Sequence, residues 1–237
     1  LRAASGDFVR HNGVMAFDTP ISLVGPVRAP VQMLADQDIG GQTSVHDGDT
    51  ADKLGLVGAP IEGPTHFSQF DPLGVCLWGQ RWFEDGCISA HFLNMVVEGE
   101  EVRPALTPST ATLAIIGAEK ADTTPVLTGT ASVGSDANTD LDDRRKRGQG
   151  DPGELHIIDQ ISIGMDTLQG RDPHAVTMGF DEHNGPLYPF TLQQKLDKIT
   201  EPCSWYNADG DSPWGTPIVP TEMLSVLAHK QGPHLPV

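Results

Sequence analysis

Hydrophobic residues in the first half of the chain predict a helix followed by a series of strands. Between positions 67 and 77, aromatic and leucine residues recur at helical spacing. The pattern begins after Pro64, and proline suits the first turn of a helix because its missing N–H would have no partner there. Pro72 and Gly74 are unfavourable inside a helix, so we expect them to kink or divide it.

Alternating β-branched residues follow this helix and favour strands. Residues 87–106 are typical of a strand, a turn around a glycine and a second strand. Residues 109–134 predict two further strands, joined by a charged turn at residues 120–124. Upstream, residues 21–31 are apolar but contain two prolines, which indicates an edge strand or an extended arm.

Weaker patterns mark the remaining segments. A short helix is expected at residues 51–54, with Thr50 as its N-cap. In the C-terminal part, strands are favoured at residues 155–165 and 174–180 and helices at residues 191–199 and 212–232.

Residues 134–153 contain almost no apolar side chains and many Gly and Asp, which is typical of a mobile linker. We therefore expect a first unit at residues 1–135 that includes an N-terminal arm, a flexible linker at residues 136–153, and a second unit at residues 154–237. The basic run at residues 144–147 is interpreted as part of the solvated linker, because it adjoins a run of Asp in an acidic chain.

A short pattern occurs twice in the chain. Residues 58–70 and residues 215–227 share a Gly, a Pro-Ile pair and a Pro-Thr pair in the same order, with one residue deleted, and each copy then continues into an apolar helix face. Unless the match is a coincidence, it indicates two copies of one unit. The second copy lacks the strands that follow the first. Either it is truncated or another chain supplies the strands, so we expect a homo- or hetero-oligomer.

Charge and composition exclude several classes of protein. Lys and Arg number 15 and Asp and Glu number 32, which gives a formal net charge of −17. This balance argues against nucleic-acid binding and against docking to an anionic membrane. No apolar run is long enough for a transmembrane helix. The three cysteines have no metal-ligand spacing, so neither a zinc site nor a disulfide scaffold is expected, and a reducing, cytoplasmic setting fits best.

The polar loop before the helix carries a recognisable motif. Together with the helix and the strands, it resembles the MaoC-like hotdog family of R-specific enoyl-CoA hydratases and related dehydratases, over roughly residues 20–135. The family motif is Gly-Asp-x-Asn-Pro-x-His, and the matching stretch is Gly40-Gly41-Gln42-Thr43-Ser44-Val45-His46. The histidine is therefore present as His46, whereas Gly41 occupies the position of the catalytic Asp and Thr43 that of the Asn.

The resemblance implies an α+β hotdog fold, in which a curved antiparallel sheet wraps around a central helix. With the repeat, it implies a double hotdog whose second unit is incomplete. It also implies that two hotdogs pair side by side with the active site near the pairing surface. The family's oxyanion-binding glycine, at the start of the central helix, matches Gly63.

The residues themselves suggest how such a site would work. His46 is the candidate general acid and base, because imidazole exchanges protons near neutral pH. The alternative is a loop histidine hydrogen-bonded to a neighbouring carboxylate. Gly63 offers a backbone N–H at a helix start, where an oxyanion can be stabilised. Asp38, ranked above Asp36 and Glu62, is expected to replace the missing acid because it is the nearest upstream carboxylate.

Five further residues are candidates for binding substrate: Glu62, His66, Trp78, Trp82 and Trp214. For the two polar residues the alternative is a capping or surface role. For the tryptophans the alternative is core packing. No motif for a nucleotide cofactor, a zinc protease or a serine hydrolase is present, so neither a cofactor nor a metal is expected.

The sequence therefore predicts a lyase that adds or removes water beside a carbonyl. The substrate would be an acyl thioester or a small organic molecule, and the few basic residues weaken the case for CoA. A hotdog thioesterase using Glu62 is the neighbouring alternative. A non-catalytic binding or structural subunit is the other. A carboxylate within hydrogen-bond distance of His46 in a closed pocket would favour the enzyme.

Overall fold

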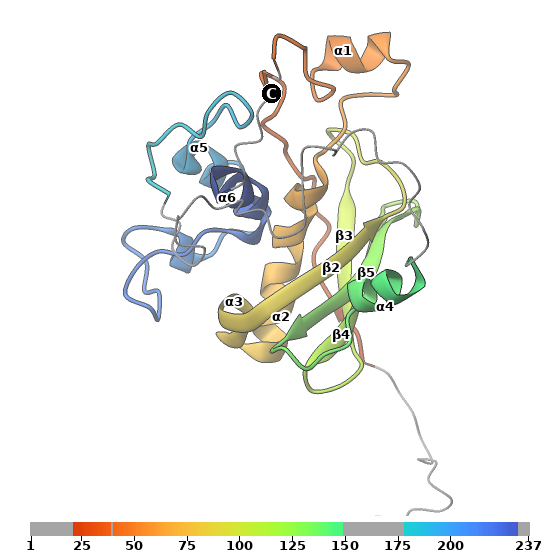
Figure 1. The fold of residues 1–237 in the computed structure, drawn as a ribbon, viewed down its shortest axis with the longest axis vertical. Coiled ribbons are helices and arrows are strands. Elements are labelled where there is room, and N and C mark those ends of the chain that lie inside the picture. The colour runs from red at the N-terminus through yellow and green to blue at the C-terminus, as the bar shows by residue number, and fades with distance from the viewer. Residues whose placement is uncertain (1–20, 39, 149–177, 232–237) are drawn as a thin grey trace, which may run out of the picture.

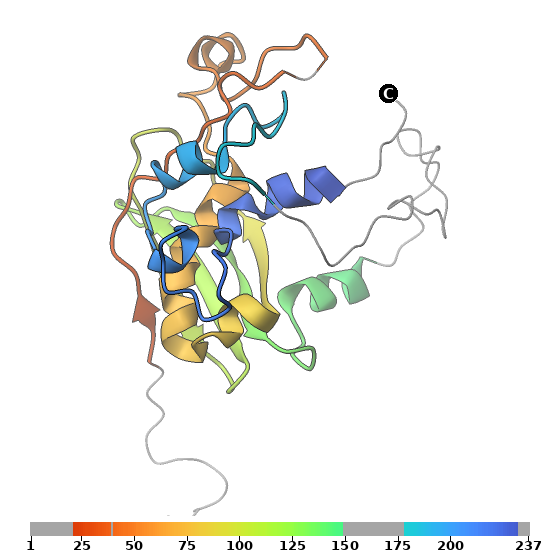
Figure 2. The same cartoon turned by 90° about the vertical axis from the view of Figure 1, so that its left-hand side faces the viewer.

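The computed structural model describes residues 21–38, 40–148 and 178–231 (Figure 1). They form a mixed α+β fold, which confirms the predicted class. One antiparallel sheet is covered on one face by a helical layer, and the C-terminal segment lies beside that layer (Figures 1 and 2).

The sheet has five strands in the order β1-β3-β4-β5-β2, and all neighbours are antiparallel. The strands are β1 (Leu23–Val24), β2 (Gly86–Phe92), β3 (Val102–Pro108), β4 (Leu113–Lys120) and β5 (Pro125–Val133). The short β1 lies at one edge of the sheet, as the two prolines in residues 21–31 predicted. The turn between β4 and β5 also lies where it was expected.

The first two long strands are consecutive in the sequence but are not neighbours in the sheet. Residues 87–106 do contain two strands, but β2 does not pair with β3; it pairs with β5 along its whole length. Gly129 in β5 explains how the backbones approach so closely. A Cβ at this position would collide with the carbonyl oxygen of Ser89 in β2.

The helical layer runs through η1 (Gly63–Phe70), α2 (Asp71–Trp78) and α3 (Arg81–Asp85). The division expected at Pro72 is confirmed, because the 3₁₀ helix ends one residue before α2 begins and Pro72 falls in the first turn of α2. Gly74 has a packing role, since a Cβ there would overlap the indole ring of Trp82.

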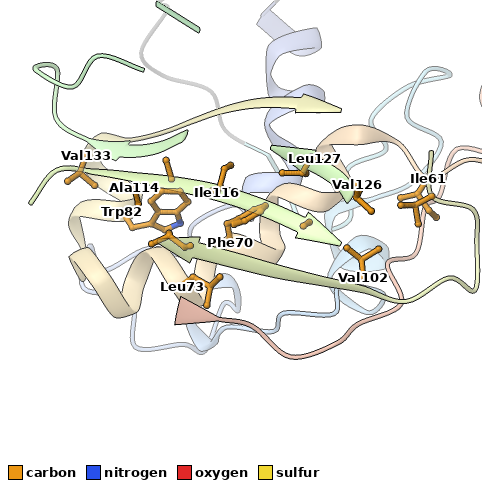
Figure 3. Packing of buried hydrophobic residues seen from close by; sticks show 14 residues of the cluster. Ile61, Phe70, Leu73, Trp82, Val102, Ala114, Ile116, Val126, Leu127 and Val133 are labelled. Atoms are coloured by element: carbon orange, nitrogen blue, oxygen red, sulfur yellow. The ribbon is translucent and has the colours of Figure 1, made fainter. Parts of the chain in front are cut away.

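The main core lies between this layer and the sheet (Figure 3). Phe70 is fully buried, and Leu73 and Trp82 lie beside it. The facing sheet residues are Val102, Leu106, Ala114, Ile116, Ala118, Val126, Leu127, Ala131 and Val133. The core therefore fixes where η1 begins relative to the strands.

The first α-helix begins earlier than the sequence predicted and has a different N-cap. The predicted helix at residues 51–54 is α1 (Gly48–Lys53), and its N-cap is Asp47 instead of Thr50. The Asp47 carboxylate accepts the Thr50 N–H at 2.8 Å, because a carboxylate at this position satisfies a free helix amide. Thr50 therefore lies inside the first turn.

The predicted linker at residues 136–153 contains α4 (Asp140–Arg147), so this part of it is not structureless. A capping box between Thr139 and Asp142 starts the helix. Acidic residues occupy its first turn and the basic run at residues 144–147 its last, an order that complements the helix dipole. No side chain of α4 is buried, so charge and capping, and not a core, define the helix. Residues 149–153 lie outside the described part.

The C-terminal segment packs around a second, smaller core. It contains α5 (Leu192–Leu196), η2 (Ser204–Tyr206), η3 (Thr221–Met223) and α6 (Leu224–Gln231), which confirms both helices predicted there. The second core consists of Leu34, Phe190, Leu192, Met223 and Val226. Within residues 178–231 the structure has no strand beyond an isolated bridge between His183 and Thr191. The strand predicted at residues 155–165 lies outside the described residues, and so does the part of the strand predicted at 174–180 that ends at residue 177.

The two copies of the repeated pattern lie against each other. Each leads through a Pro-Thr pair into a 3₁₀ helix that continues as an α-helix, η1 into α2 and η3 into α6. Ser68 Oγ accepts the Glu222 N–H at 3.0 Å and lies 3.4 Å from Thr221 Oγ1. The repeat thus joins the helical layer to the C-terminal segment (Figure 2).

Candidate functional site

The backbone of His46 is held on both sides in the loop before α1. Its N–H donates to Ser44 Oγ at 3.1 Å, and its carbonyl oxygen accepts from Gln32 Nε2 at 3.2 Å. Gln32 and Ser44 are both buried. The loop therefore presents the His46 side chain from a fixed position.

The segment that leads into η1 orients the imidazole ring. Nδ1 of His46 lies 2.7 Å from the carbonyl oxygen of Pro60. Because a carbonyl can only accept, Nδ1 carries the hydrogen, and the neutral ring has its lone pair on Nε2. Nε2 is thus the atom of this half-buried side chain that can take up a proton.

Glu62, at the start of η1, is a carboxylate whose pKa the charge of His46 affects. It is the N-cap residue of η1, yet its side chain caps no helix amide. Burial raises the pKa of the Glu62 carboxyl, and the positive charges of Lys195 and His46 oppose that rise. Within the described residues no carboxylate makes a hydrogen bond to His46. The arrangement that would favour the enzyme is therefore not found there, and the charge of His46 affects Glu62 only electrostatically.

A buried ion pair affects the pKa of Glu62. Lys195 Nζ lies 2.7 Å from Glu222 Oε1, and both side chains are at most 5 % exposed. Burial raises the pKa of Glu222, and Lys195 opposes this rise. The charge of Lys195 opposes the rise in the pKa of Glu62, and the charge of Glu222 adds to that rise. Ser225 Oγ lies buried near Glu62 and Tyr188 and makes no hydrogen bond of normal geometry.

A cavity of about 340 Å³ opens at the start of η1. Gly63, His66 and Phe92 line it, together with Ile61, Leu93, Asn94, Met95 and Val96. The structure records no hydrogen bond from the Gly63 N–H to another described residue. The Phe92 ring lies so close to Gly63 that a Cβ there would be 2.6 Å from its Cζ atom. The cavity thus combines a free helix amide with mostly apolar walls.

His66 contributes a neutral ring to this cavity. It is 2 % exposed, and burial lowers its pKa to about 4. Its Nδ1 is sealed from solvent without a hydrogen-bond partner, and the same is true of both polar side-chain atoms of Gln69. Unpaired buried polar atoms are costly, and they mark a place where a ligand or a water would gain hydrogen bonds.

Asp38 makes no hydrogen bond to His46 in the structure. Its Oδ1 accepts the Gly41 N–H at 2.8 Å and so closes the turn that the two loop glycines make. Asp38 lines an open, polar cavity of about 540 Å³ with Asp36 and Asp47, on the side of the loop near α1. The expected order of Asp38 above Glu62 therefore stays a prediction: Asp38 closes its own turn, whereas Glu62 lies at the start of η1.

The three tryptophans do not gather at the cavity beside Gly63. Trp82 is 4 % exposed in the main core, and it donates from Nε1 to Asp71 Oδ1 at 2.8 Å. Trp78 stacks on it with ring centroids 5.8 Å apart. Trp214 contacts Trp205 edge to face at 5.6 Å in the C-terminal segment. The tryptophans therefore pack in the core or in a loop, which is the alternative given for them. Trp78 and Trp82 lie at the other end of the helical layer from Gly63.

Sequence analysis missed Lys195 and Glu222. Lys195 lies on the apolar side of a short amphipathic helix, where a cation is out of place beside Leu192 and Leu196. Glu222 follows the second Pro-Thr pair, just as His66 follows the first. These two signals could have identified the residues, but only the fold shows that they pair with each other.

Within the described residues, no group of three or more His, Cys, Asp or Glu side chains could hold a metal ion. None of the helices described there has the length and hydropathy needed to span a bilayer. A scan against protein-family models gave no match, and neither did a search of curated proteins. The functional argument therefore depends on the geometry of the site.

Proposed function

We propose that the chain is a lyase of the MaoC-like hotdog type, which adds or removes water beside a carbonyl group. The observation that carries this proposal is the hydrogen bond from His46 Nδ1 to Pro60, which leaves Nε2 free close to a carboxyl of raised pKa at the start of a helix. The helical layer packed on one face of an antiparallel sheet supports the hotdog assignment.

In the dehydration direction, His46 is the base. Nε2 takes the proton from the carbon next to the carbonyl, and the electron pair of the broken C–H bond forms the new double bond. The C–O bond at the neighbouring carbon breaks, and the hydroxyl takes a proton from Glu62 and leaves as water. Hydration is the reverse of these steps.

Glu62 suits the acid role because burial helps it to keep a proton; the charge of Lys195 opposes this effect and the charge of Glu222 reinforces it. The Gly63 N–H stabilises the negative charge that develops on the carbonyl oxygen. The apolar walls of the adjacent cavity, including Phe92 and Met95, suit the hydrocarbon part of an acyl thioester. No step needs a cofactor.

The pairing of two hotdog units belongs to the same proposal. The C-terminal segment already places η3 against η1 and contributes Lys195 and Glu222 to the site. In this proposal the partner unit that pairs with the first hotdog comes from this chain, a second copy or a different chain. Sedimentation analysis of the full chain tests this part, and a stable monomer with full activity would contradict it.

The proposed activity is tested by the hydration of a short trans-2-enoyl pantetheine thioester, followed as loss of the conjugated absorbance. This substrate omits the CoA nucleotide, for which the chain has few basic residues. We expect His46→Ala to lower the rate about 10²–10⁴-fold with folding intact. Absence of hydration by the wild-type chain, or an unchanged rate for His46→Ala, would contradict the proposal.

A thioesterase is the second candidate, and Glu62 at the helix start with a raised pKa favours it. The same assay separates the two activities if free thiol is measured in parallel. A lyase consumes the enoyl group without releasing thiol, whereas a thioesterase releases thiol from saturated and unsaturated substrates alike. If neither signal appears, the non-catalytic alternative gains support.

A further inference from the structure

A second cavity, of about 350 Å³, lies on the other side of the helical layer from Gly63. Three distant segments enclose it: the N-terminal arm with Arg28, the helices α2 and α3 with Asp71 and Phe83, and the segment around η2 with Glu201 and Tyr206. Its volume falls in the range of small-molecule sites. The proposed lyase chemistry uses none of these residues.

Asp71 forms one wall of this cavity, and its hydrogen bonds are complete. Its carboxylate accepts Trp82 Nε1 at 2.8 Å, Tyr206 Oη at 2.8 Å and Thr221 Oγ1 at 2.9 Å. It is fully enclosed by these partners. Asp71 therefore supplies negative charge to the cavity without needing another donor.

Glu201, by contrast, has an unsatisfied oxygen. Its residue is 8 % exposed, and Oε2 accepts the hydroxyl of Thr200. Oε1 is buried and has no hydrogen-bond partner. The nearest cation is the Arg28 guanidinium, whose Nε is 3.8 Å away and whose side chain is 44 % exposed. A buried carboxylate oxygen without a donor is costly, so Oε1 is a place where a ligand donor would be strongly favoured.

The remaining lining residues are mostly apolar and favour a ligand with an apolar body. Pro72, Val75 and Pro202 present apolar surface, and the rings of Phe83 and Tyr206 meet edge to face at 6.3 Å. From these observations we propose that the cavity binds a small organic ammonium ion. The ammonium group donates to Glu201 Oε1, and the apolar body lies against Val75 and Phe83.

The charges around the cavity favour a cation over an anion. Glu201 and Asp71 face it, and Glu222 lies behind it and adds to the negative potential at Glu201. Arg28 is the one basic residue that lines the cavity, and it lies at the exposed rim. A carboxylate ligand would have to approach the buried acids, and this repulsion outweighs its attraction to a solvated guanidinium.

The test is an NMR titration of the full chain with benzylammonium, benzyl alcohol and phenylacetate. These probes share a benzyl group and differ in the charge and hydrogen-bonding capacity of the polar end. The indole N–H of Trp82 reports on the cavity, because it is bonded to Asp71. We expect benzylammonium to shift the Trp82 signal in a saturable manner and to bind at least about tenfold more tightly than either other probe.

Glu201→Gln should weaken benzylammonium binding at least about tenfold, because it removes the charge but keeps the shape. Glu98→Gln, an exposed carboxylate outside the cavity, makes the same change in net charge and should leave binding unaltered. Val75→Phe fills the cavity without touching either acid and should abolish binding. The proposal is overturned if benzylammonium leaves Trp82 unshifted, if phenylacetate binds more tightly, or if either Glu201→Gln or Val75→Phe binds like the wild type.

Discussion

The hydroxyl of Tyr206 donates a 2.8 Å hydrogen bond to the carboxylate of Asp71, across 135 positions of the chain. Both residues are buried. The bond ties the C-terminal segment to the first turn of α2, close to where the repeated Pro-Thr patterns meet. The C-terminal segment and the helical layer are thus joined by a buried polar contact as well as by aromatic packing.

Removing this contact should destabilise the whole chain. Tyr206→Phe leaves one Asp71 oxygen with fewer donors, and we expect a loss of about 1–3 kcal/mol in the free energy of unfolding. Urea denaturation followed by tryptophan fluorescence measures it. Ser204→Ala removes an exposed hydroxyl that bonds Asp211 nearby and should cost less than about 0.5 kcal/mol. Equal losses for the two variants would contradict this account.

The stability of the chain should decrease as the pH rises through the titration of Asp71. Burial raises the pKa of this carboxyl from 3.8 to about 6, so the folded state holds the proton more tightly than the unfolded state does. Its stabilising contribution is complete below the unfolded value and is lost as the pH rises through the folded value. Asp71→Asn should flatten this part of the stability profile, whereas Asp209→Asn, at an exposed position, should not. The measurement is the urea midpoint of unfolding at several pH values between 3.8 and about 6. Parallel pH profiles for the two variants would contradict the role of Asp71.

Gly63 and Phe92 offer a test of the cavity at the helix start. Gly63→Ala keeps the N–H but drives a methyl group into the Phe92 ring, so we expect a cost of about 1–3 kcal/mol and a lower rate of enoyl-thioester hydration. In the double variant with Phe92→Ala the clash is gone, and hydration should recover relative to Gly63→Ala. Failure of the second substitution to restore any rate would show that the loss does not arise from this clash.

Glu62→Gln should test the proposed acid role of Glu62 separately from the base role of His46. We expect dehydration to slow about 10²-fold or more, with the alkaline limb of the pH profile lost, because the amide cannot donate the proton that the leaving hydroxyl needs. Asp38→Asn should have a smaller effect, since its carboxylate is engaged by the Gly41 amide. A larger effect for Asp38→Asn would support the expected order of the two acids.

The ammonium site should respond to pH in the opposite sense to stability. Burial raises the pKa of Glu201 to about 7, while the Arg28 charge opposes this and Glu222 and Asp71 reinforce it. Benzylammonium stays protonated around neutrality, so its binding should strengthen as the pH rises through about 7 and Glu201 loses its proton. The Trp82 titration at several pH values measures this. Binding that weakens over the same range would be inconsistent with Glu201 as the acceptor.

The sequence predicted those features of the fold that depend on neighbouring residues. Proline positions correctly divided η1 from α2, and alternation located the long strands, because both signals act over a few residues. The pairing of β2 with β5 could not be predicted, because it depends on the close approach at Gly129. α4 was missed because capping and charge stabilise it without a hydrophobic face.

The site was predictable only in part. His46 and Gly63 followed from the motif, but the orientation of the imidazole depends on the Pro60 carbonyl, which no local pattern indicates. The choice of Glu62 over Asp38 depends on Lys195, which lies 133 positions beyond Glu62 in a different segment (195 − 62). Such contacts arise only when the C-terminal segment folds back onto η1.

The central claim is that His46 moves a proton at the carbon beside a carbonyl. Incubation of a 3-hydroxyacyl pantetheine thioester with the chain in D₂O, followed by proton NMR, measures this directly, because reversible dehydration replaces the α-hydrogen with deuterium. The account predicts exchange at that carbon by the wild-type chain and a rate about 10²–10⁴-fold lower for His46→Ala. Exchange that is absent in the wild type, or equally fast in His46→Ala, would contradict it.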